Sequence, residues 1–88
     1  MKHFSLVGQD GNAYSLMGYV SDAMRTAYYE AKKRNDEKSM KWFDDEARKA
    51  VMNQAMSGDY TNLLVVLSGT IEKVNDYMSE VDRYNEEG

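Results

Sequence analysis

Few side chains in this sequence could carry out a chemical reaction. His3 is the single histidine and there is no cysteine, so a Ser-His-Asp triad, a thiolate nucleophile and a His- or Cys-based metal site all lack their parts. Three carboxylates follow one another at residues 44–46, but adjacent side chains on a helix point in different directions, and acidic residues are typical of a helix start. We therefore predict a protein that is not an enzyme and that needs no cofactor and no metal.

The stretch Gly-Gln-Asp-Gly-Asn, residues 8–12, has the composition of a binding loop, and a related Gly-Asp-Tyr start follows at residues 58–60. Each precedes an apolar helical pattern. Each also combines a glycine for the turn with an Asn or Asp that can accept the free N–H groups of a first helical turn. We interpret both stretches first as helix starts. The alternative is a small-ligand site for a nucleotide or another anion, because free N–H groups at helix N-termini attract anions.

That alternative has a defined set of residues and a chemical weakness. In an up-down-up bundle the first and third helices begin at the same end of the molecule, so the two starts would form one loop surface. Asp10 and Asp59 lie within it, no Lys or Arg is close in sequence, and the Gly-Lys-Ser/Thr signature of a P-loop is missing. The candidate loop surface consists of Gln9, Asp10, Asn12, Asp59, Tyr60 and Asn62.

These candidates must be positioned by helices. Apolar residues recur at the three- and four-residue spacing of helical faces, and the 88 residues are too few for two cores. The pattern predicts an all-α single domain, residues 1–88, folded as a three-helix up-down-up bundle with a short extended N-terminal segment. Helices are expected at about residues 13–34, 40–56 and 59–84, with Asn12 as the cap of the first and Gly58 as the stop of the second.

Two parts of this bundle keep alternatives open. Residues 2–7 are rich in strand formers but have no second strand to pair with, so they either lie over the helices or pair with the same segment of another subunit. On the second helix, either Trp42 or Phe43 faces inward. The rest of its expected inner face is Ala47, Ala50, Val51 and Gln54.

The third helix carries the strongest pattern. Its apolar residues follow a heptad spacing over about three heptads. The expected seam is Tyr60, Leu64, Leu67, Ile71, Val74, Met78 and Val81, broadened by Leu63 and Val66. At this length the helix would project beyond the second helix, so its last apolar turns need cover from the first helix or from another subunit. We expect a homodimer, and the alternative is a solvated tail.

The charge is concentrated in the same helix. The formal net charge is −4, and residues 58–88 contain seven acidic and two basic residues. An acidic surface favours basic partners and disfavours nucleic acid. Direct nucleic-acid binding would have to use residues 32–34, Lys-Lys-Arg, but cations at a helix end are the normal complement of the helix dipole. The expected interaction surface consists of Glu72, Asp76, Tyr77, Glu80, Val81, Asp82 and Tyr84.

Two stretches carry a resemblance to a known group. Residues 6–20 and 55–64 resemble small proteins encoded by bacteriophages and other mobile elements, which typically show a Gly-Asp-Gly-Asn-Ala-aromatic opening and a later Ser-Gly-Asp-Tyr followed by two leucines. The middle of the chain and the tail after Asp76 match no pattern of this group. The resemblance implies an accessory protein that acts on a host or phage protein, for example in counter-defence, where an acidic helix blocks a basic nucleic-acid cleft.

The functional expectation is therefore a non-enzymatic protein-interaction module. A protein partner and a homodimer are expected, and nucleic-acid and membrane partners are not. No apolar run approaches the ~18 residues that span a bilayer, and the beginning of the chain lacks the apolar core of a signal peptide. We expect a cytoplasmic protein, in the host cytoplasm if a phage encodes it.

Overall fold

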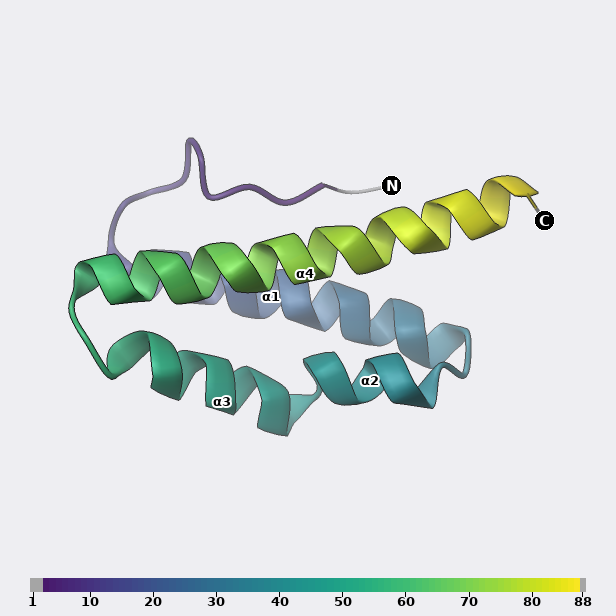
Figure 1. Ribbon diagram of the computed structural model, residues 1–88, viewed down its shortest axis with the longest axis horizontal. Coiled ribbons are helices and arrows are strands. Elements are labelled where there is room, and N and C mark those ends of the chain that lie inside the picture. Colours follow the sequence, from purple (N-terminus) through teal and green to yellow (C-terminus); the bar gives the residue numbers. More distant parts are fainter. Residues whose placement is uncertain (1–2, 88) are drawn as a thin grey trace.

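The computed structural model describes residues 3–87, and all regular structure within them is helical (Figure 1). The elements are α1 (Ala13–Lys33), α2 (Glu37–Phe43), α3 (Asp45–Met56) and α4 (Tyr60–Glu87). The predicted all-α class is confirmed. None of the helices within the described residues is long and apolar enough to cross a membrane.

The segment predicted as one helix over residues 40–56 is two helices, and the prediction was wrong there. The first starts earlier, because the Asp36 side chain accepts the Ser39 N–H at 3.1 Å and caps α2. The break lies at Asp44, whose backbone is extended (φ −72°, ψ −179°) and whose carboxylate accepts the Ala47 N–H at 2.9 Å. A short acidic side chain competes with the helical backbone for such bonds. The carboxylates of residues 44–46 do mark a helix start, but one inside the predicted helix.

The turn between α1 and α2 is shorter than the expected loop. Asn35 adopts a left-handed conformation (φ 57°) just after α1. The Asp36 N–H donates to the Ala31 carbonyl at 2.9 Å, and the Asn35 N–H donates to the Lys32 carbonyl at 3.1 Å. This pair of bonds is a Schellman motif, which satisfies the last carbonyls of α1. Asp36 thus completes one helix end and caps the next helix.

The helices enclose one apolar core. The chain runs out along α1, returns through α2 and α3, and runs out again along α4 (Figure 1). α1 contacts both α2 and α4, and α3 packs mainly on α4. The buried apolar side chains are Phe4, Leu16, Met17, Val20, Ala23, Met24, Ala27, Ala31, Phe43, Ala55, Leu63, Leu67, Ile71, Val74, Tyr77, Met78 and Val81.

Several packing details decide or change the expected inner faces, and Ala50 and Gln54, which were expected to face inward, are exposed. Phe43 is fully buried whereas Trp42 is 40% exposed, so the alternative left open on the second helix is decided in favour of Phe43. On α4, Leu63 is buried in place of Tyr60, which is 48% exposed. Because α4 packs on α1 and α3, its buried face is wider than a two-helix heptad seam.

Residues 3–12 contain no helix and run along α4 (Figure 1). The Asn75 side chain binds the backbone of Phe4 twice: its Oδ1 accepts the Phe4 N–H at 2.9 Å, and its Nδ2 donates to the Phe4 carbonyl at 2.7 Å. The Phe4 ring is buried and meets Tyr19 of α1 edge-on, with 6.0 Å between centroids. The segment is therefore held by both α1 and α4.

Candidate interaction surface

The residues predicted as an interaction surface on α4 fall into two groups. Glu72, Asp76 and Glu80 are exposed and lie at four-residue intervals, so they form one row along the helix. We call these three residues the carboxylate row. Tyr84 is 66% exposed, and Asp82 is half-buried.

Tyr77 and Val81 belong to the core, so their assignment to a partner surface was wrong. Their side chains are 5% and 2% exposed. The Tyr77 ring packs on Phe43 of α2, with 5.7 Å between centroids, and its hydroxyl donates to Asp36 Oδ2 at 3.2 Å. The cover expected from a second subunit comes, for Tyr77, from α2 and the turn before it. Met78 is buried as well, so of Tyr77, Met78, Val81 and Tyr84 only Tyr84 is exposed for a contact with a second subunit.

The contact of Tyr77 with Asp36 joins α4 to the turn after α1. The hydrogen bonds from Ser39 hold the pKa of the Asp36 carboxyl below its usual value, against a smaller opposing effect of burial. Burial raises the pKa of the Tyr77 hydroxyl, and the neighbouring charge of Asp36 adds to this effect. The Arg34 guanidinium, from the same turn after α1, lies 4.9 Å from the centre of the Tyr84 ring of α4. Sequence reasoning missed Asp36, although Asp is a preferred N-cap residue and Glu37 follows it in the first turn of α2.

The structure brings the two predicted helix starts together. Tyr60, the first residue of α4, donates its hydroxyl to the Gly11 carbonyl just before α1, at 2.5 Å. Asn12 caps α1 as predicted, accepting the Tyr14 N–H at 2.9 Å, and Asp59 accepts the Asn62 N–H at 2.9 Å.

The polar groups at this shared end mostly bind the chain itself. Asp10 accepts the Asn12 N–H at 3.1 Å, and Gln9 is exposed. The Asn62 side chain turns away from the loop surface and donates to the Gln54 carbonyl at 3.0 Å, near the end of α3. A hollow of about 380 Å³ opens here, and Asp59 is the one charged residue among those that line it. The loop surface therefore offers an anion no cation and few free N–H groups.

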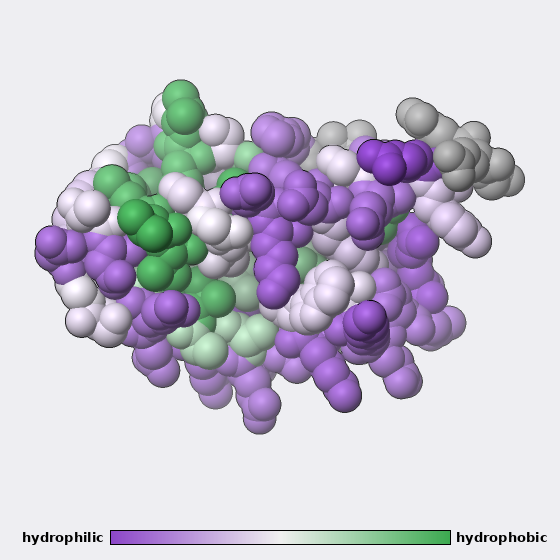
Figure 2. Space-filling view, in the orientation of Figure 1, coloured by the Kyte–Doolittle hydropathy of each residue, from purple (hydrophilic) through white to green (hydrophobic). Residues whose placement is uncertain are grey.

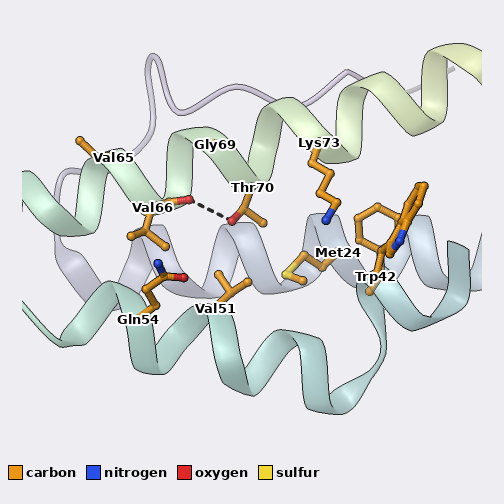
Figure 3. Close-up of a pocket in the computed structure, with 10 residues that line it drawn as sticks. Met24, Trp42, Val51, Gln54, Val65, Val66, Gly69, Thr70 and Lys73 are labelled. Atoms are coloured by element: carbon orange, nitrogen blue, oxygen red, sulfur yellow. Dashed lines mark hydrogen bonds between the residues drawn. The ribbon is translucent and has the colours of Figure 1, made fainter.

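A groove that sequence reasoning did not identify lies between α4 and the pair α2–α3 (Figure 3). Its volume is about 360 Å³. Val65 on its α4 side is 67% exposed. At the other end, Lys73 Nζ lies 5.3 Å from the centre of the Trp42 ring. The lining residues are Met24, Trp42, Phe43, Val51, Gln54, Val65, Val66, Gly69, Thr70 and Lys73.

The groove adjoins a change in surface character. Figure 2 shows apolar surface gathered where α4 begins, toward the left of the view, and hydrophilic surface toward the middle of the molecule. The sequence did contain a signal for this face. Val65, Gly69, Glu72 and Asp76 are spaced four, three and four residues apart, which places an exposed Val on the same helical face as the acidic residues.

Among the described residues no group of three or more His, Cys, Asp or Glu side chains could hold a metal ion. Comparisons with family models, with curated proteins and with solved structures gave no match to this chain. The resemblance to phage-encoded proteins stays a prediction from the two motifs.

Proposed function

We propose that this chain, as an up-down-up helical bundle with an extended N-terminal segment, is a non-enzymatic protein-interaction module that acts through the exposed acidic face of α4. The observation that carries this proposal is the carboxylate row. Within the part of the chain that the structure describes, the carboxylates of Glu72, Asp76 and Glu80 make no hydrogen bond and no ion pair.

Most other carboxylates stabilise the fold, because they cap a helix, lie in the first turn of a helix or form an ion pair. Asp36 and Asp44 cap helices, and Glu37, Asp45 and Glu46 lie in first turns, where the helix dipole favours negative charge. Asp22 pairs with Arg25, and Glu30 pairs with Lys33. The carboxylate row caps no helix and forms no ion pair within the described residues, and it lies in the middle and second half of α4. Three like charges in a row repel one another, which a basic partner would relieve.

The motifs at residues 6–20 and 55–64 support a phage or mobile-element origin for this module. In that setting we propose host takeover or counter-defence, with the acidic face of α4 blocking a basic surface on a host or phage protein, such as a nucleic-acid cleft. The negative charge of this face complements a basic cleft, because opposite charges attract the two surfaces before they make contact. The host cytoplasm is the proposed location.

Affinity capture from a host lysate tests this proposal. We compare the wild-type protein with a variant that neutralises the carboxylate row (Glu72→Gln, Asp76→Asn, Glu80→Gln). The control (Asp22→Asn, Glu37→Gln, Glu46→Gln) removes the same number of exposed negative charges elsewhere. We expect a defined protein to be captured by the wild type and the control, and lost with the row variant. Capture of nothing, or equal loss in both variants, contradicts the proposal.

Light scattering on the same samples measures the molecular mass and so distinguishes a homodimer from a monomer.

The small-ligand alternative has less support, because capping side chains occupy N–H groups at the two helix starts. A thermal shift with nucleotides or phosphate that disappears in Asn12→Ala and Asp59→Ala variants would favour it over the interaction module.

A further inference from the structure

The groove and the carboxylate row lie on one continuous face of α4. Val65, Gly69, Glu72 and Asp76 share this face by their spacing, and all four are exposed. At 1.5 Å per residue, Glu72 lies about 10 Å and Asp76 about 16 Å beyond Val65 along the helix axis. Val65 and the first two carboxylates of the row are thus about two to three helical turns apart on the same surface.

Gly69, in the middle of this face, is not required by the packing of the chain itself. A Cβ placed there would meet no atom within 4 Å. Glycine in the interior of a helix is unfavourable relative to alanine, so an intramolecular reason would normally be a close neighbour, and there is none. Glycine in a helix does permit close approach by the backbone of another chain. Figure 3 shows Gly69 on α4 between Val65 and Lys73, at the groove.

The charges beside the groove restrict its occupant. The Lys73 ammonium lies against the Trp42 ring at the end of the groove, so it opposes a cation placed there. The carboxylate row begins with Glu72 beside this end of the groove, and Asp76 and Glu80 continue it along the helix, where they favour cations. A second copy that presented its own α4 would bring acidic row against acidic row. Charge complementarity therefore selects a basic segment with apolar residues at the Val65 end of the groove and cations from the Trp42 end onward.

We propose that the groove and the carboxylate row together form one docking surface for an amphipathic cationic helix of a partner protein. Apolar side chains of that helix fill the groove between Val65 and Trp42, and its Lys or Arg side chains bind Glu72, Asp76 and Glu80. This is the helix-in-groove mode of recognition. The inference rests on the proposed function and adds to it the class of partner and the place of the apolar anchor.

Trp42 gives a direct readout, because it is the single tryptophan of the chain and lies in the groove. The probe is a synthetic tryptophan-free helical peptide of about four turns, with two leucines one turn apart and three lysines on the same face further along. A matched peptide carries glutamates in place of the lysines. We expect the lysine peptide to shift the Trp42 emission to the blue in a saturable way, and the glutamate peptide to leave it unchanged.

Two open glycines provide a matched pair of variants. Gly18 on α1, like Gly69, has no atom within 4 Å of a placed Cβ, and it lies outside the groove. Both substitutions, Gly69→Gln and Gly18→Gln, should leave the circular dichroism spectrum unchanged. We expect Gly69→Gln to weaken peptide binding about tenfold or more, because its side chain obstructs the groove, and Gly18→Gln to have no effect. Val65→Ser, compared with Val7→Ser, tests the same site without adding bulk.

Several results overturn the proposal. Equal affinities of Gly69→Gln and Gly18→Gln mean that the peptide does not use the groove, and equal binding of the glutamate peptide removes the role of the carboxylate row. Self-association that Gly69→Gln abolishes would make a second copy the occupant instead. If a lysate partner is lost with the row variant but is retained by Gly69→Gln, the proposed function stands and this inference is wrong. If no partner is captured at all, it is the proposed function that fails.

Discussion

At the scale of single residues, many polar side chains of this protein bind backbone. Asn12, Asp36 and Asp44 cap helices, Asn62 reaches the end of α3, and Asn75 holds the N-terminal segment. A chain without proline depends on such side chains to end its helices and to start new ones. The polar side chains that bind no backbone group, above all those of the carboxylate row, are available for binding a partner.

Two glycines with opposite surroundings lead to a first prediction. A Cβ at Gly58 would lie 2.9 Å from the Cβ of Asn62, in the first turn of α4, whereas a Cβ at Gly69 meets nothing. We expect Gly69→Ala to raise the free energy of unfolding by about 1 kcal/mol through helix propensity. Gly58→Ala should lower it by about 1–3 kcal/mol, because Asn62 must move from the α3 carbonyls that it binds. Urea denaturation measures both changes, and a stabilised Gly58→Ala variant would contradict the close contact.

The pKa of Asp36 leads to a second prediction. Its folded pKa is below the ordinary 3.8, so the stabilisation it gives is present above that value and is lost as the pH falls through the lower folded pKa. Asp36→Asn retains an amide oxygen that can accept the Ser39 N–H, but it cannot titrate. We expect the wild type to lose more stability than Asp36→Asn between about pH 5 and pH 2. Parallel curves of urea midpoint against pH would mean that the Asp36 carboxylate has no special stability.

At the scale of elements, sequence reasoning identified the features that rest on local rules. The cap at Asn12, the cation-rich end of α1 and the start of α4 were predicted correctly, because capping and helical periodicity involve only neighbouring residues. The break at Asp44 was not predicted, since Asp inside a helical pattern is ordinary and no glycine or proline marks the break. That break, together with the Schellman turn at Asn35, sets the direction of α2. It therefore also decides that Phe43 is buried and that Trp42 remains at the groove.

The predicted site shows the same division. The exposed positions of Glu72, Asp76 and Glu80 follow from the helical period of α4. The burial of Val81 follows from it too, because Val81 lies on the expected seam. The burial of Tyr77 does not, because it depends on where α2 and the preceding turn lie. The groove was missed for a related reason: its lining residues come from α1, α2, α3 and α4, and a space between packed helices has no local sequence pattern.

The attachment of the N-terminal segment leads to a third prediction. Asn75 makes both of its hydrogen bonds to the backbone of Phe4, and each is partly buried. We expect Asn75→Ala to lower the free energy of unfolding by about 1–3 kcal/mol, from two lost bonds of ordinary strength. Amide hydrogen exchange at Phe4 should become faster, while exchange in the middle of α1 should change little. Asn53→Ala, at an exposed position of α3, serves as the control. Unchanged exchange at Phe4 would show that its buried ring is a sufficient anchor.

At the scale of the whole molecule, the protein is a flat slab of 43 × 27 × 15 Å with α4 along its length. The 28 residues of α4 correspond to about 42 Å of helix, so this helix spans the long axis. α4, the longest element, thus carries an excess of acidic over basic residues, whereas most of the cations lie on α1, α2 and α3. A helix that runs the full length of a slab suits a partner that also docks lengthwise.

Salt dependence gives the last prediction, which belongs to this scale because it measures the field of the exposed row. The three carboxylates are about 6 Å apart along the axis, within a Debye length of about 10 Å at 0.1 M salt, so an approaching cationic peptide experiences them together. Raising sodium chloride from about 0.05 M to about 0.5 M shortens the Debye length to roughly a third and should weaken binding of the lysine peptide to the wild type about tenfold or more.

The variant with a neutral row should bind the lysine peptide more weakly at low salt, and its affinity should change little with salt, because the apolar contact in the groove remains and is not screened. The control with three neutralised carboxylates elsewhere should follow the wild type. Equal salt slopes for the row variant and the control would assign the attraction to net charge, and the α4 face would then have no special part in it.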